Sequence, residues 1–234
     1  MSSPRQLADL PYASHLRPFD GSLTVDGDYD TVHFDGGQFE GADAGQARFL
    51  ESAFSAVAFT GGRYRGARFN DVWLDGVRWV GSDVADSDWL DGELIGCVLA
   101  GLEMFGTVMN RVTFHRCKFE SVNLRTAELR EVTFADCLLR DTDLGGAKLT
   151  DVAFPGSTLD GVRCGNARMT RVDLRDATRL DITEGFDALR GATITGGQLL
   201  ELAPQFAQAL GVTVQERGDA LRAPRTARRK RQGR

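Results

Sequence analysis

The chain has 234 residues, of which 42% are hydrophobic and 26% charged, with a formal net charge of −5 and four cysteines. It contains no apolar run of the roughly 18 residues that span a membrane, and its N-terminus lacks the apolar stretch of a secretory signal, so we expect a cytoplasmic protein. The charge is unevenly distributed: residues 216–234 carry eight Lys or Arg and two acids, which leaves 20 bases and 31 acids, a net charge of −11, in residues 1–215.

The first segment, residues 1–28, follows no regular pattern. The apolar side chains that stand among its prolines include Tyr12, Leu16, Phe19 and Leu23. Stacked β-structure exposes apolar core and unpaired strand edges at its ends, and these invite aggregation unless they are covered. We therefore expect residues 1–28 to form an irregular cap.

A strict five-residue period follows, from residue 32 to residue 176. Of its twenty-nine consecutive centres, Phe34 to Leu174 in steps of five, only Ala44 and Cys164 are not large and apolar, and a mostly small residue lies two positions before each centre. A period of five fits neither a helix nor a simple strand, so the chain must turn a corner in every unit. The residue two positions after the centre is Gly in twelve units and Asp in seven, as turns require. The period predicts a stacked β-solenoid.

These units resemble the pentapeptide-repeat family, whose signature is a small residue, a polar residue, Leu or Phe, and two variable positions. Residues 67–71, 122–126, 127–131 and 147–151 read A-R-F-N-D, V-N-L-R-T, A-E-L-R-E and A-K-L-T-D. The style is closest to the MfpA-like fluoroquinolone-resistance proteins. The resemblance implies a right-handed quadrilateral β-helix with four units per coil, here about seven coils within residues 29–196.

The C-terminal part predicts a helical cap over residues 197–215. Leu199, Leu202, Phe206 and Leu210 follow a helical pattern, and we expect Pro204 to divide it into two short helices. The simpler interpretation is a cover for the last coil, while the resemblance to MfpA-like proteins implies that this element also pairs with a second copy to form a homodimer. The basic tail, residues 216–234, is expected to be disordered, with nucleic acid as a conceivable partner.

No catalytic, cofactor or metal site is predicted. The three histidines are scattered, and no nucleophile motif, phosphate-binding loop or zinc spacing is present. Cys97, Cys117 and Cys137 lie twenty residues apart and would stack in successive coils. A disulfide or a metal site is conceivable there, but packing of a small apolar residue in the inward position is the favoured interpretation, and no enzyme is expected.

Acidic residues concentrate between residues 71 and 103. Arg78 is the only base in this range, and the eight acids are Asp71, Asp75, Asp83, Asp86, Asp88, Asp91, Glu93 and Glu103. A twenty-residue coil places Glu51, Asp71 and Asp91 in one row and Asp83 and Glu103 in another. Stacked like charges are mildly destabilising, so a row indicates a use, although Asp at a corner can simply hold the turn. We predict these eight residues as an acidic partner-binding surface.

One side of the coil lacks these acids and predicts a second surface. Val80 and Val98 face outward there and Ile95 lies around its corner. An exposed apolar patch bordered by charge is typical of a protein-binding surface, although the terminal caps could also cover part of it.

Two functions remain open at this point. The first is an acidic rod that imitates duplex DNA toward a DNA-handling enzyme, and the family resemblance implies DNA gyrase. The second is a general protein-interaction scaffold without nucleic-acid mimicry. Neither involves a small-molecule substrate or a membrane.

Overall fold

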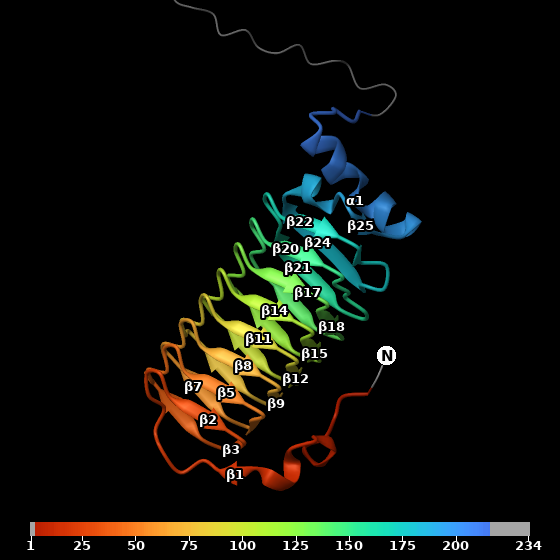
Figure 1. Cartoon of the computed structure of the whole chain (residues 1–234). Helices are drawn as coiled ribbons and strands as arrows, with labels where there is room; N and C mark the ends of the chain where they lie inside the picture. Colours follow the sequence, from red (N-terminus) through yellow and green to blue (C-terminus); the bar gives the residue numbers. More distant parts are fainter. Residues whose placement is uncertain (1–2, 216–234) are drawn as a thin grey trace, which may run out of the picture.

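The computed structural model describes residues 3–215, which form a rod of stacked coils (Figure 1). Residue i pairs in parallel register with residue i+20, so that Trp73 pairs with Ala53 in the preceding coil and with Glu93 in the next. Four five-residue units therefore complete one coil, and the predicted all-β solenoid is confirmed. No helix within the described range is long and apolar enough to cross a membrane.

Three sides of the coil are short strands that join into parallel sheets along the rod. The first face contains β2 (Asp28–Asp30), β5 (Arg48–Leu50), β8 (Arg68–Asn70), β11 (Asp88–Leu90), β14 (Val108–Asn110), β17 (Glu128–Arg130), β20 (Lys148–Thr150) and β22 (Arg168–Thr170). The second face contains β1 (Arg17–Pro18), β3 (Val32–Asp35), β6 (Ala53–Ser55), β9 (Trp73–Asp75), β12 (Glu93–Ile95), β15 (Thr113–His115) and β18 (Thr133–Ala135). The third face contains β4 (Gln38–Glu40), β7 (Ala58–Thr60), β10 (Arg78–Val80), β13 (Val98–Ala100), β16 (Lys118–Glu120), β19 (Leu138–Arg140), β21 (Thr158–Arg163) and β24 (Arg179–Glu184).

The fourth face is a column of single β-bridges. Its members are Asp43, Arg63, Asp83, Glu103, Asn123, Asp143 and Arg163. The coil is thus four-sided, and the rod has about eight turns rather than the predicted seven, since the first face alone has eight strands. The additional turn arises because the stack starts at β2, before the regular period, and continues through β24 beyond it. A last short pair, β23 (Val172–Asp173) with β25 (Ala192–Thr193), closes the stack.

Large side chains at the repeat centres fill the rod in ladders along its axis. Phe34 stacks on Phe54 with ring centroids 4.5 Å apart, and Phe114, Phe134 and Phe154 stack at 5.0 Å. The small inward residues fill the remaining space, among them Cys97, Cys117 and Cys137, which are buried and free. Each of these thiols donates weakly to backbone carbonyls at 3.3–3.6 Å, which suits packing rather than chemistry.

The corners explain the Gly and Asp pattern. Every corner residue from Gly36 to Arg171, taken in steps of five, has a positive φ. Glycine adopts this left-handed conformation without cost, and Asp and Asn tolerate it better than most residues. Asp71 and Asp91, with φ of 50° and 55°, lie at such corners.

The C-terminal end is closed by η3 (Phe186–Leu189) and α1 (Gly196–Ala209). Thr195 caps α1, and Gln198 Nε2 donates to the Leu174 carbonyl at 2.7 Å, which ties the helix to the last coil. The prediction that Pro204 divides this segment into two helices is wrong, because α1 runs through it. Pro204 has no N–H to donate to the carbonyl of residue 200, and the helix continues without that hydrogen bond on a part of α1 where Leu200 is exposed.

The N-terminal segment is a strap rather than an end cap alone. We call residues 3–18 the strap; it contains η1 (Leu7–Asp9), η2 (Ala13–His15) and β1. In Figure 1 it leaves the first coil and runs back along the outside of the rod toward β9 and β12. Phe19 closes the first end, because its ring packs on Tyr29, Phe34 and Phe39.

Candidate functional site

The eight predicted acidic residues wrap around three sides of the rod. Glu103 and Asp83 lie on the fourth face, Asp86 and Asp88 follow at the corner and on the first face, and Asp75 lies on the second face. Asp71 and Asp91 occupy the corner between the first and second faces. The third face carries none of them, as the sequence predicted.

Arg65 neutralises two of these carboxylates at once. Its Nε donates to Asp83 Oδ2 at 3.2 Å and a terminal nitrogen donates to Asp86 Oδ2 at 2.6 Å. The same guanidinium lies 4.9 Å from the centroid of the Phe105 ring. A partner that binds Asp83 and Asp86 must therefore compete with this internal cation.

Other acids are paired along the coil axis. Arg111 binds Asp91 through two hydrogen bonds of 2.6 and 2.7 Å, which lowers the pKa of the Asp91 carboxyl. Asp88 lies 4.0 Å from Arg68, and Glu103 accepts a hydrogen bond from Asn123. These are exposed contacts, and such ion pairs typically contribute about 0–1 kcal/mol.

Asp71 and Asp75 have no ion pair within 4.0 Å among residues 3–215. Partial burial, and then the neighbouring Asp91 carboxylate, raise the pKa of Asp71, while Arg5 and Arg111 oppose this shift. Glu51, which precedes Asp71 in the same corner row, also has no ion pair in this range. This row therefore retains unneutralised like charge.

Two predicted surface residues are covered. Glu93 is only 6% exposed and Ile95 also 6%, because the strap lies over them. Glu93 accepts hydrogen bonds from the backbone N–H and the guanidinium of Arg5. The prediction that Glu93 and Ile95 belong to an open partner-binding surface is corrected, because the strap covers these two outward positions of the second face.

Val80 and Val98 lie on neighbouring strands of the third face, β10 and β13, and both are half-buried. Val80 pairs in register with Thr60 and Ala100, whereas Val98 pairs with Arg78 and Lys118, so two exposed bases flank this small apolar patch. Glycines occupy most of the flanking corners: Gly36, Gly76 and Gly96 along one edge, and Gly41, Gly61, Gly81 and Gly101 along the other. No side chain rises from these corners above the sheet.

The predicted cap residues of α1 divide into two groups. Leu202 is buried against the last coil and Phe206 is half-buried with its ring 6.0 Å from that of Phe186. Leu199 and Leu210 are 50% and 79% exposed. Further apolar side chains, Leu200, Val212 and Val214, are also exposed and line a shallow groove with Ala203, Pro204 and Ala207. The predicted tail, residues 216–234, lies outside the described residues.

Sequence reasoning missed Arg5, Arg65 and His115. The twenty-residue register would have found the Asp91–Arg111 pair, since the two residues share a corner row. It could not find Arg5, which belongs to no repeat and meets Glu93 from 88 positions away. Within residues 3–215, no group of three or more His, Cys, Asp and Glu side chains is arranged to hold a metal ion.

Comparison with known proteins identifies a pentapeptide repeat region at residues 87–164. Two similar solved structures are those of QnrB1, a plasmid-mediated fluoroquinolone-resistance protein. The trypsin-treated form is 14% identical, and the match covers 81% of this chain and 100% of that chain with a TM-score of 0.42. The full-length form is 12% identical, and the match covers 74% of this chain and 99% of that chain with a TM-score of 0.39. A third is that of HetL, a pentapeptide-repeat protein involved in heterocyst differentiation regulation in the cyanobacterium Nostoc. It is 17% identical, and the match covers 75% of this chain and 86% of that chain with a TM-score of 0.33. No curated protein matches the sequence significantly.

Proposed function

Because this chain is a pentapeptide-repeat protein, we propose that it is a non-enzymatic binding protein whose acidic rod takes the place of duplex DNA on a DNA-handling enzyme, with DNA gyrase as the candidate partner. The observation that supports this most is the corner row of Glu51, Asp71 and Asp91. Its carboxylates recur once per coil, at the strand spacing of about 4.8 Å. A duplex presents phosphates about 3.4 Å apart along each strand, and the row offers carboxylates at a similar spacing, of which Glu51 and Asp71 are unpaired while Arg111 binds Asp91.

The raised pKa of Asp71 gives this row a reason to bind cations. Its carboxylate is partly buried and lies next to Asp91, so the ionised form is disfavoured in the free protein. A lysine or arginine of a partner would relieve that cost. The paired acids Asp83 and Asp86 can contribute as well, since an exposed pair such as theirs with Arg65 is weak enough for a partner's cation to replace.

The test is a gyrase assay with matched variants. Glu51→Gln together with Asp71→Asn removes two unpaired charges of the row, whereas Asp151→Asn removes a paired charge at an equivalent corner, with φ of 56°. Inhibition of supercoiling, or protection from drug-induced cleavage, is expected for the natural protein at low salt, to weaken steeply at high salt, and to be lost in the double variant but kept in Asp151→Asn. Equal inhibition or protection by all three proteins, or an effect that does not change with salt concentration, contradicts DNA mimicry.

A protein-interaction scaffold without mimicry is the second candidate, and the flat third-face patch around Val80 and Val98 favours it. Such a patch would bind a partner by shape and apolar contact. Val80→Asp or Val98→Asp should then abolish partner binding, and Glu51→Gln with Asp71→Asn should leave it unchanged. The opposite pattern supports the acidic row.

We also propose that α1 pairs with its copy in a second molecule. The exposed apolar side chains on and after the helix, Leu199, Leu200, Leu210, Val212 and Val214, support this. Light scattering after size exclusion should give a dimer, which Leu200→Glu converts to a monomer with an unchanged circular dichroism spectrum. A natural protein that is monomeric at high concentration refutes the pairing. Binding of nucleic acid by residues 216–234 stays a prediction.

A further inference from the structure

The strap covers an apolar strip on the outer side of the second face. Centres such as Leu74 and Leu94 point inward, so Trp73 and Ile95 point outward by the alternation of a strand. They are nevertheless only 4% and 6% exposed, because Leu10 and Tyr12 of the strap pack on them. Burial in this contact raises the pKa of Tyr12 above its usual range. The strip therefore depends on a separate segment to keep it from water.

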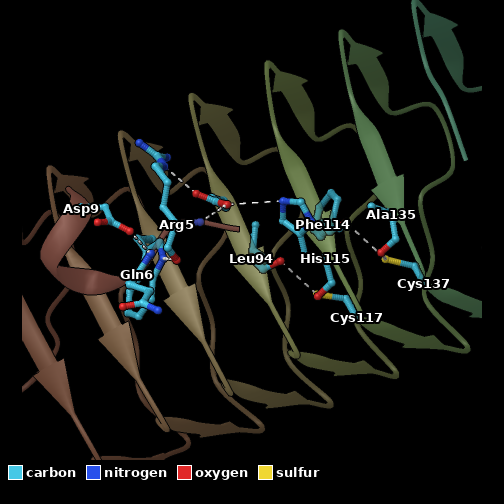
Figure 2. Close-up of polar contacts among 11 residues, drawn as sticks. Arg5, Gln6, Asp9, Leu94, Phe114, His115, Cys117, Ala135 and Cys137 are labelled. Carbon is cyan, nitrogen blue, oxygen red and sulfur yellow. Dashed lines mark hydrogen bonds and ion pairs between the residues drawn. The ribbon is translucent and has the colours of Figure 1, made fainter. Parts of the chain in front are cut away.

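A polar cluster fixes the far end of the strap. Arg5 gives Glu93 two hydrogen bonds, from its backbone N–H at 3.0 Å and from Nε at 2.6 Å, and the Arg5 carbonyl accepts from Trp73 Nε1 at 3.1 Å. His115 Nε2 lies 3.4 Å from the same carboxylate. In Figure 2 dashed lines join Arg5 and His115 to one unlabelled carboxylate, which the contacts above identify as that of Glu93. The Glu93 carboxylate at this end of the strip is thus bound by an arginine side chain.

The strap is not woven into the sheet over most of its length. Its backbone pairs with the rod only at β1, where Arg17 aligns with Val32. Between residues 3 and 16, the backbone–backbone hydrogen bonds stay within the strap itself. Side-chain packing and the contacts of Arg5 hold this stretch on the rod, so it can leave without breaking a β-ladder.

We propose that the covered strip, formed by Ala53, Trp73, Glu93 and Ile95, is a docking surface for a segment of a protein partner, and that the strap occupies it in the free protein. The segment that fits has an arginine followed at a distance of five and seven residues by a leucine and a tyrosine, as in Arg5, Leu10 and Tyr12. Its arginine binds Glu93, and its apolar side chains cover Trp73 and Ile95. This strip borders the acidic corner row, because Arg5 and Glu93 line one cavity with Asp71 and Asp91, and it lies on a different face from the Val80 and Val98 patch.

A labelled peptide of residues 3–16 tests the proposal on the full-length chain by fluorescence anisotropy. Arg5→Ala weakens the strap but leaves the surface intact, so its affinity for the peptide should exceed that of the natural protein by about tenfold. Glu93→Gln weakens the strap as well but removes the carboxylate, so it should bind the peptide more weakly than Arg5→Ala does. Arg48→Ala, which breaks an exposed pair with Asp28 on the first face, should behave as the natural protein.

Hydrogen exchange provides a second measurement that needs no variant. In uniformly ¹⁵N-labelled natural protein, excess unlabelled peptide should increase exchange at residues 3–16 of the chain, and a peptide carrying Arg5→Ala should not. The proposal is overturned if neither peptide changes strap exchange, or if Arg5→Ala loses strap protection, keeps its circular dichroism spectrum and gains no affinity for the peptide.

Discussion

Asp71→Asn should stabilise the rod at neutral pH, although it removes a charge from the proposed binding row. Asp71 lies at a corner with φ of 50°, a conformation that Asn tolerates as well as Asp, so the substitution leaves the backbone unstrained. Two like charges about 5 Å apart in water repel by about 0.8 kcal/mol. Salt screening and the exposure of Asp71 reduce this, so we expect a gain of about 0.5 kcal/mol in the free energy of unfolding.

The gain should depend on pH with a defined sign. Burial and Asp91 raise the pKa of Asp71 in the folded protein, so the unfolded chain ionises first as pH rises and the natural protein loses stability above the ordinary Asp pKa of about 3.9. Urea unfolding of both proteins should therefore give equal stabilities near pH 3 and a difference that grows until Asp71 is ionised in the folded state as well.

Asp151→Asn is the matched control with the opposite expectation. Asp151 occupies an equivalent corner but binds Arg171 through two hydrogen bonds, which lower the pKa of Asp151. Its neutralisation should decrease stability above the ordinary Asp pKa, and the loss should vanish as pH falls through the lowered value. If both substitutions shift stability in the same direction, the charge environment does not decide the effect and the reasoning about the corner row is wrong.

Three further predictions concern the core and the second face. Phe134→Ala should lower the free energy of unfolding by about 3–5 kcal/mol, because Phe134 is buried and stacked on both sides. The same truncation of the half-buried Phe39 near the first end should lower it by less. Urea unfolding compares the two variants, and equal losses would contradict ladder packing. Burial lowers the pKa of His115, so the imidazole is protonated in the unfolded chain before it is protonated in the folded protein as pH falls. Stability should therefore decrease as pH drops below about 6.5. A pH series of thermal unfolding should show this dependence in the natural protein, and His115→Gln should remove it. Burial raises the pKa of the Cys117 thiol, so iodoacetamide should modify it only in denaturant, and labelling of the folded protein would contradict this.

The repeat made the rod predictable and the ends unpredictable. Within residues 32–176 each position of the repeat has the same environment in every coil, so the twenty-nine units share one geometry. The inward centres, the corner residues and the neighbours along a row can therefore be assigned from residue numbers alone. The Asp91–Arg111 pair lay within reach of this reasoning. The Arg5–Glu93 contact did not, because an irregular segment can dock on any side of a solenoid and no period constrains where. Continuity of α1 through Pro204 likewise does not follow from a helical pattern, which predicts a break at the proline.

The left-handed corners have a consequence for how such a surface can change. The backbone takes the same conformation at Gly61, Asp71, Arg111 and Glu131, so corner identity and coil geometry are largely independent. A non-glycine residue at such a position typically costs about 1 kcal/mol, an amount that many stacked coils can absorb. Charges along the rod edges can therefore be exchanged one coil at a time without altering the core, so the charge pattern of the surface can change while the scaffold stays constant.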